Sequence, residues 1–144
     1  MIYKLSSKKM NSKIIIVTIS TWFLFMVFAI INAALRDGVY KPIIGDLRAH
    51  QLSTIMFIAI LLIITYFVFR YSQIELTTQQ TYIIGTIWLL ATICFEFLAG
   101  HYVFGNSWEK IFADYNILKG RIWIIVLITI LFAPYISNKI LSIR

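Results

Sequence analysis

The side chain best placed to do chemistry is Glu96, because the stretch from Trp88 to Leu98 contains no other charge. An ionised carboxylate in an apolar setting costs several kcal/mol, so it must be paired, protonated or hydrated. Arg36 and Arg121 are the two guanidinium groups that we expect within its reach. An ion pair with either arginine would fix helix packing, whereas a carboxylate without one could bind a ligand or act as a base. The sequence leaves both interpretations open.

Two histidines are the other candidates for acid–base or ligand chemistry. His50 follows Asp46, a plausible N-cap of the second helix, and the positive end of that helix would keep the imidazole neutral. A hydrogen-bonded interfacial histidine is the alternative. His101 lies five residues after Glu96, about 140° around a helix, so these two do not form a dyad. Two histidines could hold haem or a metal, but no HExxH motif accompanies them, and we predict neither a metal nor a cofactor.

The elements that must position these residues are four apolar segments. The chain has 144 residues, 60% of them hydrophobic and 13% charged, which is too apolar for a soluble domain of this size. A helix needs about 20 apolar residues to cross a bilayer. We therefore predict an all-α membrane four-helix bundle of two antiparallel hairpins, forming one integral domain over residues 1–144. The expected spans are about 14–36, 50–70, 80–104 and 120–139.

Two of these segments carry small and polar residues at steps of three or four, which predicts one interior face on each helix. In the first segment these residues are Thr18, Thr21, Phe25, Ala29, Asn32 and Arg36. In the third segment they are Gly85, Trp88, Thr92, Glu96 and Gly100. Glu96 is therefore expected to face the interior, and Asn32 to need an interhelical partner. Arg36 either descends toward Glu96 or extends to the membrane surface.

The connection between the last two spans contains a short amphipathic pattern over about residues 107–118. Asn106 is expected to cap it, with Glu109 reaching back. One side of this helix is apolar and carries Trp108, Ile111, Phe112 and Tyr115. Tryptophan and tyrosine suit the headgroup level, so we predict an interfacial helix that either covers the site as a lid or only fills the interface.

Antiparallel hairpins bring most of the candidate side chains to one end of the bundle. The expected ring consists of Asn32, Arg36, His50, Glu96, His101 and Arg121. Lysines cluster instead before the first span, at Lys4, Lys8, Lys9 and Lys13. The positive-inside rule then predicts that both termini are cytoplasmic and that the ring faces outward.

Several short stretches of the outward half are similar to small bacterial multi-span membrane proteins of uncharacterised function. They are Glu96–Val103, Ser107–Glu109, Ala113–Asn116 and Gly120–Arg121, together with Asn32–Arg36 and His50–Thr54. The resemblance implies a multi-pass protein of the bacterial plasma (inner) membrane. It implies no particular activity, substrate or catalytic residue.

The leading functional prediction is that the outward pocket binds an anionic lipid headgroup or a small acidic ligand. Arg36 and Arg121 would hold the negative charge. The ligand would be oriented by Asn32, His50, Glu96 and His101 and covered by Trp108. One alternative is a membrane enzyme with His50 or Glu96 as the base; another is a structural accessory subunit of a membrane complex. We expect membrane lipids as partners, a second copy or another membrane protein as a further option, and no nucleic acid despite the net charge of +7.

Overall fold

Four long helices form the part of the chain that the computed structural model describes, residues 9–143. They are α1 (Ser12–Leu35), α3 (Asp46–Ser72), α4 (Thr78–Leu98) and α6 (Trp123–Ser142). Each is long and apolar enough to cross a membrane, and these residues contain no strand. The predicted all-α four-helix bundle is confirmed. Lys4 and Lys8 of the basic cluster lie outside the described residues.

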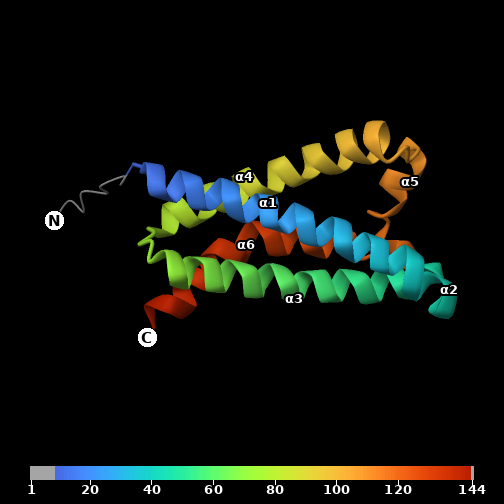
Figure 1. Cartoon of the computed structure of the whole chain (residues 1–144), viewed down its shortest axis with the longest axis horizontal. Coiled ribbons are helices and arrows are strands. Elements are labelled where there is room, and N and C mark those ends of the chain that lie inside the picture. The colour runs from blue at the N-terminus through green and yellow to red at the C-terminus, as the bar shows by residue number, and fades with distance from the viewer. Residues whose placement is uncertain (1–8, 144) are drawn as a thin grey trace.

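Shorter elements extend or connect these helices at one end of the bundle. A π-helical turn η1 (Arg36–Tyr40) and α2 (Lys41–Ile44) continue α1, and a π-helical turn η2 (Ala99–Val103) continues α4. The connection to α6 contains α5 (Trp108–Ala113) and a 3-10 turn η3 (Ile117–Lys119). Figure 1 places α2 and α5 at the end opposite to the start of α1 and the end of α6.

The interfacial helix is shorter than the predicted 107–118. Its cap is Ser107, whose side chain accepts the Lys110 N–H, and not Asn106, whose side chain bonds the Lys110 ammonium. The α-helix ends at Ala113 because the next two side chains, Asp114 and Tyr115, turn toward groups in the bundle. Asp46 likewise does not cap α3 through its side chain, which forms ion pairs instead.

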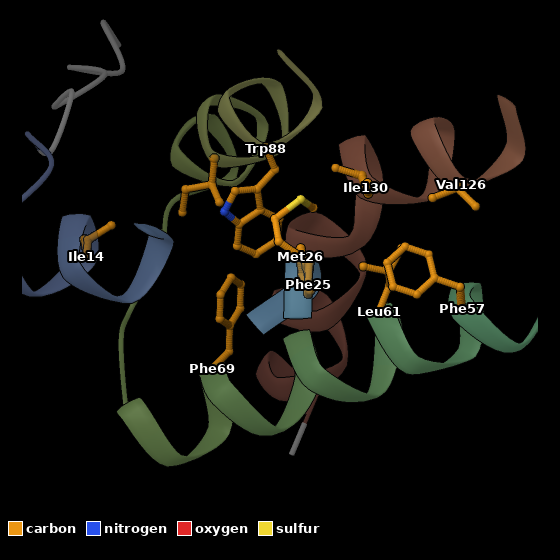
Figure 2. Packing of buried hydrophobic residues seen from close by; sticks show 10 residues of the cluster. Ile14, Phe25, Met26, Phe57, Leu61, Phe69, Trp88, Val126 and Ile130 are labelled. Atoms are coloured by element: carbon orange, nitrogen blue, oxygen red, sulfur yellow. The ribbon is translucent and has the colours of Figure 1, made fainter. Parts of the chain in front are cut away.

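The helices pack in a chain of neighbours, α1 against α3, α3 against α6 and α6 against α4 (Figure 1). Aromatic and aliphatic side chains fill the space between them (Figure 2). Trp88 is fully buried, stands edge-on to Phe25 at 4.9 Å, and donates its indole N–H to the Thr18 carbonyl at 2.8 Å. A second indole, Trp22, donates to the Thr92 hydroxyl at 3.1 Å. These two bonds tie α1 to α4.

The predicted interior faces of α1 and α4 are confirmed. On α1, Thr18, Thr21, Phe25 and Asn32 are buried, and on α4, Gly85, Trp88 and Thr92 are buried. Gly85 marks the closest approach of two helices, because a methyl group added there would lie 2.0 Å from the backbone oxygen of Leu131 in α6. Only glycine fits this position without moving α4 away from α6.

Candidate binding cavity between α1 and α4

A cavity of about 530 Å³ lies between the second half of α1 and the second half of α4, beyond the two indole bonds. It extends along α1 from Met26 to Arg36, which is about 15 Å at the rise of an α-helix. Ile111 of α5 lies over one end, against Gly100. Most of the wall is apolar and is made by Met26, Ala29, Ile30, Ala33, Ala34, Phe57, Phe95, Phe104, Ile111 and Trp123.

Glu96 is half-buried, lines this cavity, and is held by two neutral donors. Its Oε2 atom accepts the Tyr115 hydroxyl at 2.5 Å and the Trp123 indole N–H at 2.8 Å. Its Oε1 atom has no hydrogen bond within residues 9–143. Burial, together with the bond to Glu96, raises the pKa of Tyr115, so the phenol stays protonated and donates.

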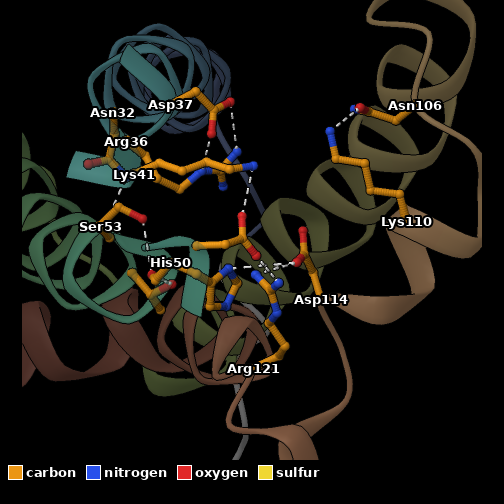
Figure 3. Close-up of polar contacts among 12 residues, drawn as sticks. Asn32, Arg36, Asp37, Lys41, His50, Ser53, Asn106, Lys110, Asp114 and Arg121 are labelled. Carbon is orange, nitrogen blue, oxygen red and sulfur yellow. Dashed lines mark hydrogen bonds and ion pairs between the residues drawn. The ribbon is translucent and has the colours of Figure 1, made fainter. Parts of the chain in front are cut away.

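The ion pair between Glu96 and an arginine, one of the two interpretations that the sequence leaves open, does not form, because both arginines have carboxylates closer to them. Arg36 binds Asp37 with two nitrogens, at 2.9 and 3.2 Å. Arg121 bonds Asp46 and lies 3.5 Å from an oxygen of Asp114 (Figure 3). Arg36 lines the cavity, whereas Arg121 is not among its lining residues and instead connects α3 to the segment after α5.

Lys110 is one of three charged cavity residues that sequence reasoning missed, together with Asp37 and Asp114. Its ammonium donates to the Asn106 side-chain oxygen at 2.8 Å, as Figure 3 shows. Among residues 9–143 it has no carboxylate within 4.0 Å. The amphipathic pattern placed Lys110 on a solvated face, but α5 turns that face partly toward the cavity. No sequence pattern shows this orientation, because it depends on how α5 packs against Gly100 through Ile111.

His50 and Asn32 lie beside the cavity without lining it. His50 is 2% exposed, and its Nδ1 atom is 3.7 Å from an Asp114 oxygen, longer than a hydrogen bond. Its Nε2 atom is buried without a partner. Asn32 donates to the Ser53 backbone oxygen at 3.0 Å, which is the interhelical partner that we expected for it. Of the two candidate bases, Glu96 alone lines the cavity.

His101 and Trp108 lie together and are not among the residues that line the cavity. Their rings stack with centroids 3.9 Å apart, and His101 Nδ1 is bonded to the Asn106 carbonyl at 2.8 Å. The residue of α5 that covers the cavity is therefore Ile111, and not Trp108. In the part of the chain from residue 9 to residue 143, no three histidine, cysteine or acidic side chains are grouped so that they could hold a metal ion.

Comparisons with protein-family models, with curated proteins and with solved structures find no match to this chain. The likeness to small bacterial multi-span proteins thus stays a prediction. The cavity combines an apolar wall with one cation, Lys110, and one carboxylate, Glu96, that have no ion-pair partner within residues 9–143.

Proposed function

We propose that the protein binds an amphiphilic membrane lipid or another acidic amphiphile between α1 and α4. The apolar part of the ligand lies along the cavity wall, and its acidic group lies at Lys110 and Arg36. The observation that supports this proposal is a cavity of about 530 Å³ with an apolar wall and charged residues at its outer end. Cavities of about 300 to 1,000 Å³ are typical of small-molecule sites.

Headgroup contacts, rather than the apolar wall, provide the selectivity in this proposal. Moving an acyl chain from the bilayer into an apolar cavity changes its surroundings little, since both are hydrocarbon-like. Each lysine or arginine near an acidic headgroup contributes about 1 kcal/mol. Lys110 is better suited than Arg36, because Arg36 is already paired with Asp37.

Arg121 takes a different part in this proposal from the one predicted for it. Its guanidinium is already bonded to Asp46 and close to Asp114, so it positions the chain around the cavity and does not meet the ligand. The residues that we propose to bind the acidic group are therefore Arg36 and Lys110, in place of the predicted Arg36 and Arg121.

We further propose that the protein lies in a bacterial plasma membrane with both termini cytoplasmic, so that the cavity opens outward. Support comes from the basic residues near the ends of α1, α3 and α6 on the terminal side, although the opposite side carries nearly as many. In a Cys94→Ser background, Glu109→Cys in whole cells is expected to react with a membrane-impermeant maleimide, and Gln79→Cys is not. Reaction of Gln79→Cys and not of Glu109→Cys would show instead that both termini lie outside the cell.

Filling the cavity tests the binding proposal. Ala33 lines the cavity, so Ala33→Phe occupies its space without changing any charge. Ala59→Phe is the matched control, because Ala59 is exposed on α3 and is not a lining residue. Native mass spectrometry is expected to detect a retained phospholipid on the wild-type and Ala59→Phe proteins, and about tenfold less on Ala33→Phe. Equal retention by a folded Ala33→Phe protein would overturn the proposal.

A further inference from the structure

Five ionisable residues line the cavity, and most of their charge is already neutralised. They are Arg36, Asp37, Glu96, Lys110 and Asp114. Arg36 and Asp37 form a two-bond ion pair with each other, and Asp114 lies 3.5 Å from Arg121 behind the wall. One cation, Lys110, and one carboxylate, Glu96, are left without an ion-pair partner among residues 9–143.

The hydrogen bonds of Glu96 leave one of its two carboxylate oxygens free to accept from a positively charged donor. Both of its hydrogen bonds go to Oε2 and come from neutral groups, Tyr115 and Trp123. No arginine, lysine or histidine of the described part of the chain lies within 4.0 Å of it. An N–H of an ammonium group would bond the free Oε1 and neutralise the carboxylate, whereas an anionic group would be repelled.

The two unpaired charges lie at different depths. Lys110 belongs to α5, which covers the outer end of the cavity through the contact of Ile111 with Gly100. Glu96 precedes Gly100 by one helical turn, so it lies about 6 Å further along α4 toward the middle of the bundle. A ligand that meets both residues therefore needs its negative group outside and its positive group inside.

From this arrangement we propose that the ligand headgroup is zwitterionic, with a phosphate at Lys110 and a primary ammonium that folds back from the phosphate, alongside the acyl chains, to Glu96 Oε1. This inference rests on the proposed function and names its ligand class, an amino-phospholipid. A purely anionic headgroup leaves Glu96 unpaired, and a purely cationic one leaves Lys110 unpaired. A trimethylated ammonium has no N–H to donate to Oε1, so the same reasoning disfavours it.

The test measures lipid retention by native mass spectrometry, with phosphatidylethanolamine, phosphatidylglycerol and phosphatidylcholine offered at equal concentrations. The wild-type protein is expected to favour phosphatidylethanolamine over both others by about tenfold. Glu96→Gln is expected to bind phosphatidylethanolamine and phosphatidylglycerol equally, while its amide oxygen still accepts from Tyr115 and Trp123. Lys110→Gln is expected to weaken both lipids alike, and Lys110→Arg to restore them.

Equal binding of the three lipids by the wild-type protein, or an unchanged preference in Glu96→Gln, would overturn the inference. The proposed function fails separately, when Ala33→Phe retains as much lipid as the wild-type protein. Soluble phosphoethanolamine distinguishes the two sources of the same headgroup chemistry. If soluble phosphoethanolamine displaces the bound lipid, the protein recognises the zwitterionic headgroup without its acyl chains. If it does not displace the lipid while the preference for phosphatidylethanolamine remains, the ligand is the intact lipid.

Discussion

Replacing Gly85 with alanine tests whether α4 and α6 meet as closely as the structure places them. The added methyl carbon would lie 2.0 Å from the Leu131 backbone oxygen and 2.9 Å from its carbonyl carbon. Contacts under 3.0 Å force something to shift, and a helix backbone cannot rotate away as a side chain can. The two helices must therefore separate by about 1 Å.

The cost of this separation is large for a single methyl group. Overpacking a well-filled interior costs typically about 1–3 kcal/mol, and a gap of about 1 Å removes up to half of the dispersion energy of each contact. Because every contact along the α4–α6 interface is loosened together, we expect a loss of about 3 kcal/mol in the free energy of unfolding. That loss corresponds to roughly a hundredfold change in the folding equilibrium.

The assay is unfolding of the purified protein in mixed micelles of a mild detergent and dodecyl sulfate, followed by the loss of helical circular dichroism. Gly38→Ala is the matched control, since a methyl group there meets nothing within 4 Å and the backbone is helical. Gly38→Ala is expected to be neutral or stabilising by up to about 1 kcal/mol. A Gly85→Ala protein as stable as the wild type would refute the close approach of α4 and α6.

Three further substitutions test contacts around the cavity. Thr92→Val leaves the Trp22 indole N–H without its acceptor and should lower the free energy of unfolding by about 1 kcal/mol. The pKa of Tyr115 is raised by burial and by its bond to Glu96. The contribution of this bond to the free energy of unfolding is therefore complete below about pH 10 and decreases above it. Tyr115→Phe should remove this part of the loss of stability at alkaline pH, measured by unfolding the protein at a series of pH values. Arg121→Gln should speed hydrogen exchange of backbone amides between residues 114 and 120.

Each of these has a control of the same chemical type. Thr86→Val removes an exposed hydroxyl that bonds only its own helix, so its stability should change by less than about 0.5 kcal/mol. Tyr102→Phe alters an exposed phenol, so the free energy of unfolding at neutral pH should change by less than about 0.5 kcal/mol. Lys41→Gln removes an exposed ion pair to Asp46 without releasing Asp114, so exchange should stay slow. An effect in a control equal to that in its partner would contradict the contact concerned.

The spans and their interior faces could be predicted because they depend on local patterns. Uncharged windows long enough to cross a bilayer identify the helices, and residues at steps of three or four identify their buried faces. Gly85, Trp88 and Thr92 were assigned to the interior on this ground and are buried. The need of Asn32 for an interhelical partner followed from the same reasoning, and its amide donates to Ser53.

The partners of the charged groups could not be predicted, because they depend on a competition that the sequence does not rank. Three aspartates lie near two arginines, and the arginines bind the aspartates instead of Glu96. Adjacent residues of a regular α-helix do not face each other, yet Arg36 binds Asp37 in the π-helical turn that begins there. The orientation of the Lys110 side chain could not be predicted for a similar reason, since the orientation of α5 is set by contacts at Ile111 and Tyr115.

Lipid binding in the cavity can be seen directly in a crystal structure of the protein with a phosphatidylethanolamine whose acyl chains carry bromine. Anomalous scattering then locates the chains without assumptions about density. If the lipid binds between α1 and α4, a bromine peak is expected inside the cavity, beside Ala33, Phe95 and Trp123, and it is expected to be lost in Ala33→Phe crystals. Bromine peaks confined to the outer, lipid-facing sides of the four helices would contradict binding in this cavity.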